Sequence, residues 1–397
     1  MNVLLIGAGT VGEAIARLST GRPWLTRLTV ADYSARRAAH VAAQAGERAT
    51  HVALDASDPA AVRALIAATK PDLVLNAVDP RFVPIIFDAA LDAGVHYLDM
   101  ATSLSVPDPK QPYRVPGVML GDYQERKRHE WEAKGKLALV GMGMDPGLSN
   151  IFAAYAKKWT LDEVDALHVR DGGDLRIKGY PFATVFSIWT VIEECLNPPL
   201  VYRNGQIEVR EPFSEPEDFV FPEGIGPVMC VNVEHEEIVQ LPRTIPAGLV
   251  TFKYALGADF IETLRLLHRL GLDGKTPVDV KGTKVAPRDM IAALSPEPAS
   301  LGKHMTGRAV VGVLASGRKE GRQRETFHYQ VADAGETMGR YKLQPVAWQT
   351  GVMPLMAMQL IAEGVWSGAG VKSPEMLDPD PFLDLCEDYD VTVKQIG

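Results

Sequence analysis

The sequence predicts an α/β protein: a doubly wound parallel sheet in the N-terminal part, and a second α/β domain built on a mixed or antiparallel sheet. Its 397 residues exceed what one hydrophobic core usually supports, which favours two domains. Short apolar runs alternate with helix-like segments over the first hundred residues. Strands of alternating polarity follow after about residue 161.

The first hundred residues have a regular strand–helix rhythm. Short apolar runs predict strands, and segments with apolar residues every three or four positions predict helices. We expect strands at 3–6, 27–31, 51–54, 73–76 and 96–98, separated by helices at 11–19, 35–45, 59–69 and 83–93. Such alternation connects parallel strands through helices, so it indicates a sheet covered on both faces.

The remainder of the chain is less regular. Four prolines between 103 and 121 predict a loop, and a polar helix is expected at 123–134. Further strands are expected at 137–140, 164–170, 207–210, 229–232 and 326–332, and further helices at 148–156 and 348–363. We therefore expect residues 1–150, completed by C-terminal helices in 345–397, to form the first domain, and residues 151–344 to form the second.

The composition narrows the classes of partner. A formal net charge of −9 disfavours nucleic acids and anionic membranes, because both repel an acidic protein, but leaves small substrates open. The three cysteines lack metal-ligand spacing and predict buried free thiols. The first strand has no basic leader before it, and no run of about twenty apolar residues occurs. We expect a cytoplasmic protein without a metal.

A glycine-rich turn follows the first expected strand. Gly7, Gly9 and Gly12 form the pattern G-x-G-x-x-G, with Thr10 and Val11 between the last two. The first glycine permits a tight turn, the second lets the backbone approach a pyrophosphate, and the third allows close helix packing. Because a strand precedes this turn and an amphipathic helix follows it, the pattern predicts a dinucleotide-binding Rossmann domain.

The end of the second strand bears on the choice of cofactor. Asp32 follows Gly12 by twenty residues, which is where a carboxylate accepts hydrogen bonds from the adenosine ribose. A carboxylate there repels a 2′-phosphate, so NAD is favoured over NADP. Arg36 and Arg37 leave NADP open, because either could contact a 2′-phosphate, stack on adenine or lie in solvent.

Two later strand ends extend the expected cofactor site. Asp55 is expected to touch the adenine edge, and Asn76, Ala77 and Val78 are expected near the nicotinamide half. Ordinary turn roles for these residues remain open.

Several segments resemble the saccharopine dehydrogenase family, which includes saccharopine reductases, lysine 6-dehydrogenases and carboxynorspermidine dehydrogenases. The resemblance runs nearly end to end, and its most specific part is Asp-Pro-Gly-Leu-Ser-Asn at 145–150. The other matching segments are 7–12, 73–76, 96–99, 370–375 and 380–383. The resemblance implies a Rossmann domain completed by C-terminal helices and a second domain for substrate binding and homodimerisation. It also implies oxidation of an amine to an imine, or the reverse.

Amine oxidation needs a group that moves protons. Asp145 is the first candidate, because it ends a strand just before a Pro-Gly turn, and Asp99 is the second. A turn or helix-cap role is open for both residues. Asn150 could hydrogen-bond the cofactor carboxamide or the substrate, or lie on a helix surface.

Basic residues are candidates for binding a substrate carboxylate. Lys253 stands where the family has an arginine segment, and we expect it to be the anchor and a candidate catalytic residue; Arg243 is a second candidate anchor. A solvated surface charge is open for both residues. Arg176 follows a glycine pair that resembles a substrate loop. Residues 235–237, His-Glu-Glu, are expected in a surface strand and not in a metal site, because no further ligands lie at suitable spacing.

These observations favour an NAD(P)-dependent oxidoreductase acting on a C–N bond, with saccharopine-like substrates first and lysine second. A carboxynorspermidine-type reductase is an alternative that would need a more acidic pocket for cationic amines. A non-catalytic protein that senses NAD(H) is an alternative from another class.

Overall fold

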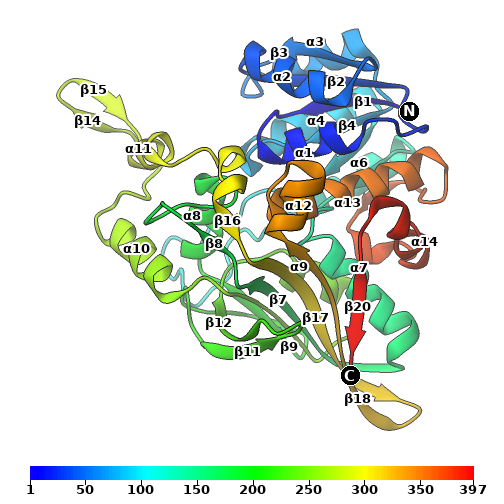
Figure 1. Cartoon of the computed structure of the whole chain (residues 1–397), viewed down its shortest axis with the longest axis vertical. Helices are drawn as coiled ribbons and strands as arrows, with labels where there is room; N and C mark the ends of the chain where they lie inside the picture. The colour runs from blue at the N-terminus through cyan, green and yellow to red at the C-terminus, as the bar shows by residue number, and fades with distance from the viewer.

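Two large β-sheets dominate the protein in a computed structural model that describes residues 1–397. The N-terminal sheet and its helices lie at the top of Figure 1, and the second sheet lies below them. Helices from the C-terminal part, drawn in orange, lie between the two.

The N-terminal sheet is parallel throughout. Its strand order is β3, β2, β1, β4, β5, β6, β19, and the first six strands reproduce the Rossmann order. β19 comes from the C-terminal part of the chain and pairs with β6. The strands span Asn2–Ile6 (β1), Arg27–Asp32 (β2), Ala49–Ala53 (β3), Leu73–Asn76 (β4), His96–Asp99 (β5), Leu137–Leu139 (β6) and Gly370–Lys372 (β19).

Both faces of this sheet are apolar, as expected for buried parallel strands. Val3 and Leu5 of β1 belong to one apolar cluster with α1 and α2, whereas Leu4 and Ile6 belong to a second cluster with α3 and α4. The four helices span Thr10–Leu18 (α1), Ala35–Ala45 (α2), Pro59–Thr69 (α3) and Val83–Ala93 (α4). The predicted doubly wound sheet is therefore confirmed.

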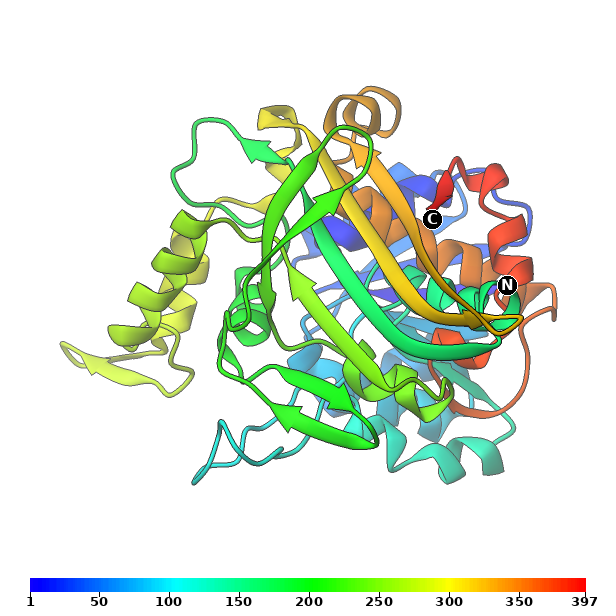
Figure 2. The same ribbon diagram turned by 90° about the horizontal axis from the view of Figure 1, so that it is seen from below.

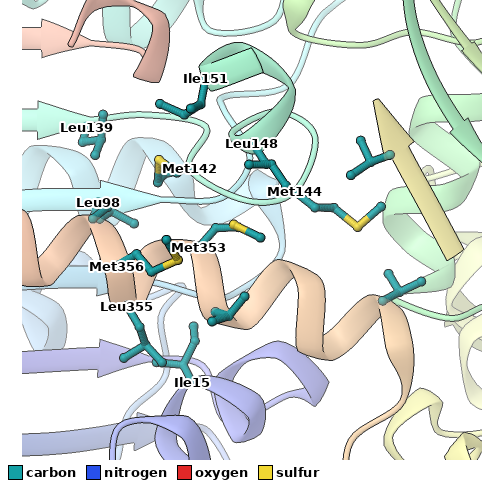
Figure 3. Packing of buried hydrophobic residues seen from close by; sticks show 14 of the residues in the cluster. Ile15, Leu98, Leu139, Met142, Met144, Leu148, Ile151, Met353, Leu355 and Met356 are labelled. Atoms are coloured by element: carbon teal, nitrogen blue, oxygen red, sulfur yellow. The ribbon is translucent and has the colours of Figure 1, made fainter. Parts of the chain in front are cut away.

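A long C-terminal helix links the two halves. α13 (Pro345–Ala362) is buried along most of its length and packs on α1. Figure 3 shows Met353 and Met356 of α13 in one apolar cluster with Leu98 of β5 and with Leu148, the first residue of α7 (Leu148–Tyr155). One apolar cluster thus continues from the first sheet into the second half and fixes how the halves meet.

The second sheet is mixed, as predicted. Its order is β10, β9, β13, β7, β17, β18, β20, and β12 joins β13 while β11 joins β12. Only β13 and β7 run parallel. The long strands curve across Figure 2. The strands span Glu163–Gly173 (β7), Leu200–Arg203 (β9), Gln206–Val209 (β10), Glu217–Phe221 (β11), Gly226–Asn232 (β12), Leu249–Tyr254 (β13), Arg308–Lys319 (β17), Arg322–Asp333 (β18) and Val393–Ile396 (β20).

An arm projects from the second half. It consists of α10 (Ala258–Arg269), the hairpin of β14 (Val278–Val280) and β15 (Thr283–Val285), and α11 (Pro287–Leu294). It stands away from both sheets at the left of Figures 1 and 2. Shorter elements complete the fold: α7 (Leu148–Tyr155), α8 (Ile188–Leu196), α9 (Glu237–Gln240), α12 (Ala334–Tyr341), α14 (Asp380–Asp384), β8 (Arg176–Ile177) and β16 (Met305–Thr306).

One predicted helix is wrong. Residues 123–134 form two short helices, α5 (Asp122–Glu125) and α6 (Arg128–Ala133), instead of one. After the break, Trp131 turns into the core and packs against Phe87. Burial of this aromatic side chain outweighs the continuity of a polar helix. None of the helices in the protein is both long and apolar enough to span a membrane.

Candidate active site

A cavity of about 650 Å³ lies between the carboxyl ends of the parallel strands and the second half of the protein. Its walls come from the glycine-rich turn, the loops after β2 to β6, and parts of β7, α8, β13 and the segment after β12. Doubly wound sheets bind ligands outside the carboxyl ends of their strands. This cavity is therefore the candidate active site.

The glycine-rich turn fits a dinucleotide pyrophosphate. A Cβ on Gly7 would lie 2.4 Å from the carbonyl oxygen of Ala77, and a Cβ on Gly12 would lie 2.0 Å from that of Gly7. A Cβ on Gly9 would meet no atom within 4 Å, and Gly9, Thr10 and Val11 line the cavity. Gly9 caps α1, whose first N–H groups are free to bind an anion.

The predicted adenosine and nicotinamide residues line the cavity. Asp32 accepts hydrogen bonds from the backbone N–H groups of residues 8 and 34, both at 2.9 Å, which hold its carboxylate at the end of β2. Asp55 and the run of residues 76–78 also line the cavity, although the Asn76 amide donates to a buried tyrosine hydroxyl. Their assignment to the cofactor stays a prediction.

Arg36 and Arg37 lie outside the cavity wall. Arg36 is exposed. Arg37 donates to the carbonyl oxygen of Ala8 and pairs with Glu297 at 3.2 Å, so its guanidinium is already engaged.

The end of the cavity away from the glycine-rich turn is acidic. Among the charged side chains that line the whole cavity, Arg81 and His235 are the only basic ones. We call the carboxylates at this end the acidic wall: Asp145, Asp171, Glu193, Glu194, Glu234 and Glu236. Glu193 contacts Arg288 and Lys275, but no other member forms an ion pair with an arginine or lysine.

Four carboxylates of the acidic wall bind protons unusually well. Burial raises the pKa of Glu234 to about 7 and raises that of Glu236. Burial, together with nearby carboxylates, holds the pKa values of Asp145 and Asp171 well above their usual range. A bound cation would stabilise the ionised carboxylates and release these protons.

His235 lies inside the acidic wall, and the predicted surface strand at 235–237 is wrong. Its Nε2 is 3.0 Å from Glu194 Oε1, and its Nδ1 contacts Glu237 Oε2. The ring stacks on Phe252 with centroids 3.6 Å apart. Burial disfavours an imidazolium, but the two carboxylates outweigh it and raise the pKa of His235 well above its usual value.

Lys253 does not line the cavity, contrary to its predicted role as substrate anchor. Successive side chains of a strand point to opposite faces, so Lys253 and Tyr254 of β13 diverge. Lys253 pairs with Glu217 at 2.7 Å, whereas Tyr254 lines the cavity. β7 repeats this division in register, because Arg170 pairs with Glu217 while Asp171 lines the cavity.

Four other candidate residues also lie outside the cavity wall. Asp99 is buried and accepts hydrogen bonds from a backbone N–H, a tyrosine and a glutamine, and burial raises its pKa to about 7. Asn150 is buried and donates to a glutamine and to Glu375. Arg243 pairs with a surface glutamate at 3.1 Å, and Arg176 is exposed. Of the predicted catalytic residues, only Asp145 lines the cavity.

Protein-family models match most of the chain. The saccharopine dehydrogenase NADP binding domain matches residues 3–139, and the saccharopine dehydrogenase C-terminal domain matches residues 143–391. The chain belongs to the saccharopine dehydrogenase family.

Similar proteins align with this chain over nearly its whole length. The carboxynorspermidine synthase of Vibrio cholerae is 30% identical over 397 residues, covering 97% of this chain and 94% of its own. The carboxyaminopropylagmatine dehydrogenase of Synechocystis is 30% identical over 387 residues, covering 96% and 94%. The apo saccharopine dehydrogenase (L-Glu forming) of Saccharomyces cerevisiae has a similar fold, with a TM-score of 0.70 at 16% identity over 100% of both chains. The resemblance is thus confirmed, and the protein is an NAD(P)-dependent dehydrogenase.

We expect Gly9→Ala and Gly12→Ala to separate cofactor binding from folding. The Cβ of Gly9→Ala would enter only open space, so the free energy of unfolding should fall by less than about 1 kcal/mol. It would occupy the place of a pyrophosphate, and the Kd for NADH, measured by fluorescence quenching, should rise about tenfold or more. Gly12→Ala should instead lower the Tm, because its Cβ overlaps a backbone oxygen. Equal losses of stability in both variants would contradict this assignment of Gly9.

Proposed function

We propose that this saccharopine dehydrogenase family member acts on the C–N bond of a cationic, amine-derived amino acid of the carboxynorspermidine type. The acidic wall carries the proposal, because a cavity lined by carboxylates and one arginine favours a substrate with several positive nitrogens and few carboxylates. The names of the relatives from Vibrio cholerae and Synechocystis support it. Saccharopine, with three carboxylates, and lysine rank behind this class.

Arg81 is our candidate for binding the substrate carboxylate. It follows β4, lies 3.5 Å from Asp79, and packs over the Trp189 ring at 4.3 Å. No other arginine and no lysine lines the cavity. The stacked guanidinium presents the planar donor set that suits a carboxylate.

Asp145 is our candidate for moving the proton. It is carried by the loop after β6 and lines the cavity together with the rest of the acidic wall. When bound, the nicotinamide cofactor accepts or supplies the hydride. The high pKa of Asp145 suits it to take the proton of the substrate nitrogen during oxidation and to return it during reduction.

We also propose NAD as the preferred cofactor, because Asp32 would repel a 2′-phosphate and Arg37 is engaged elsewhere. In this proposal, residues 1–150 and the C-terminal helices of 345–397 hold the cofactor, and residues 151–344 hold the substrate. The free thiols of Cys195, Cys230 and Cys386 accord with a reducing cytoplasm as the location.

A substrate panel tests the proposed function. Carboxynorspermidine, carboxyaminopropylagmatine, saccharopine and lysine are each supplied with NAD⁺ or NADP⁺, and absorbance of the reduced nicotinamide is followed. We expect kcat/KM to be highest for a carboxylated polyamine with NAD⁺, by about tenfold or more over saccharopine, a gap of about 1.4 kcal/mol. Turnover of saccharopine alone would overturn the substrate class, and preference for NADP⁺ would overturn the role of Asp32. If no substrate changes the absorbance of the reduced nicotinamide while NADH still binds, a role in sensing NAD(H) would be favoured.

Asp145→Asn tests the proton step. We expect kcat for amine oxidation to fall about 100-fold or more, because the amide cannot accept a proton. The Kd for NADH should stay within twofold, since cofactor binding lies elsewhere. The wild-type kcat/KM should rise with pH as Asp145 loses its proton, and this limb should flatten in the variant. A full wild-type rate in Asp145→Asn would remove Asp145 from the mechanism.

We propose a homodimer in which the arm packs against a second copy. Its exposed apolar side chains are Leu266, Leu270, Val278, Val280, Met290 and Leu294. Such side chains gather on surfaces that another protein covers. Homodimerisation through the second domain is also what the resemblance to the family implies.

Sedimentation velocity tests the dimer. We expect twice the chain mass at micromolar concentration, and a shift toward the monomer in Leu294→Asp, whose wild-type side chain is 78% exposed. Val365→Asp is the control, because Val365 is 51% exposed but lies off the arm. A monomeric wild type, or equal effects of both variants, would contradict the arm as the interface.

A further inference from the structure

Glu194 makes the shortest contact of the acidic wall with the buried imidazolium of His235. Its Oε1 lies 3.0 Å from His235 Nε2, and its Oε2 is buried without a hydrogen-bond partner. Glu194 lines the cavity. A buried carboxylate oxygen that lacks a donor is costly, so an N–H group supplied by a ligand would be favoured at this place.

His235 cannot supply that missing donor. Both of its ring nitrogens are engaged, one by Glu194 and the other by Glu237, and its side chain is 4% exposed. Glu237 in turn accepts a hydrogen bond from Ser149 Oγ at 2.6 Å, and the ring is stacked on Phe252. The imidazolium is thus fixed on every side. It holds Glu194 in one orientation.

Asp171 is a second carboxylate of the second half that lines the cavity, and the charge of Glu194 acts on it. It is 5% exposed and accepts no hydrogen bond from another side chain. Tyr254 of β13 is paired in register with Asp171 of β7, and it also lines the cavity. Glu194 and Asp171 come from α8 and β7 of the second half, whereas Asp145 comes from the loop after β6. Burial and then the charge of Asp171 raise the pKa of Asp145, so the pair borders the proposed proton-transfer group and is placed for the next nitrogen along the substrate.

We propose that Glu194 and Asp171 form a subsite for the terminal cationic nitrogen of the substrate. His235 is a positioning residue for this subsite. The ligand group is an ammonium or a guanidinium, whose N–H donors complete Glu194 Oε2. A neutral terminus leaves that oxygen unpaired and is disfavoured. The inference rests on the proposed function and names the part of the substrate that its acidic wall selects.

A variant–substrate cycle tests the subsite. Carboxynorspermidine is compared with its N-propyl analogue, in which the terminal amine is missing, in the wild type and in Glu194→Gln. In the wild type the analogue should have a KM about tenfold or more above that of the full substrate. Glu194→Gln should raise the KM of the full substrate by a similar factor and leave that of the analogue unchanged. The Kd for NADH should change less than twofold.

Two further variants separate local contact from general charge. Glu297→Gln removes a carboxylate that lines the same cavity but pairs with Arg37 near the glycine-rich turn, and it should change the KM less than twofold. Glu194→Asp keeps the charge and should retain part of the discrimination. An effect of Glu297→Gln as large as that of Glu194→Gln would overturn the subsite in favour of a general field.

Calorimetry of the NADH complex with norspermidine keeps the test independent of turnover. The wild type should bind this triamine about tenfold or more tightly than Glu194→Gln does. Equal binding, or an equal KM loss for both substrates, would overturn the subsite and leave the proposed function standing. If the wild type binds norspermidine more tightly than Glu194→Gln does but turns over no amine, the proposed function alone would be overturned. If Glu194→Gln also raises the KM of carboxyaminopropylagmatine, the subsite takes a guanidinium.

Discussion

The carboxylates of the acidic wall are enclosed in the cavity with fewer positive side chains than would neutralise them. The function of this protein depends on this imbalance of charge. Desolvation makes each buried carboxylate costly in its charged form, and the pKa of Glu234 near 7 records that cost. In the empty cavity, protons therefore supply part of the missing positive charge. A substrate that brings cationic nitrogens replaces those protons and relieves the repulsion between the carboxylates. Charge balance inside the cavity links the fold to the choice of substrate.

The scaffold keeps this charge opposite the glycine-rich turn. α13 packs on α1 behind that turn, and the apolar cluster it joins continues through Met144 and Leu148 toward the second sheet. Asp145 lies within this packed connection, between Met144 and the start of α7. A close-packed core is hardly compressible, so the elements it joins keep fixed positions relative to one another. The distance from the glycine-rich turn to the acidic wall is thus set by apolar packing and not by the polar groups of the cavity.

Local patterns made the Rossmann half predictable, and long-range placement hid much of the rest. The glycines and the strand–helix rhythm act within a few residues, and Asp32 stands at a fixed spacing of twenty residues from Gly12, so the sequence shows them directly. On β7 and β13, however, charged or polar residues occupy both faces, and nothing local reveals that Asp171 and Tyr254 face the cavity while Lys253 faces Glu217. Likewise, the burial of His235 depends on Glu194, forty-one residues earlier in the chain.

The buried imidazolium explains how a wall of mutually repelling carboxylates can remain selective. Carboxylates that only face one another keep protons, and a protonated carboxyl group can donate to a neutral ligand as readily as it accepts from a cation. His235 sets Glu194 apart, because its ring is locked by Glu237 on the other side and holds a positive charge 3.0 Å from Glu194 Oε1. The second oxygen of Glu194 is buried without a donor and therefore discriminates between ligands with and without an N–H group. Specificity for a terminal cation then follows from one fixed charge within an otherwise adjustable cluster.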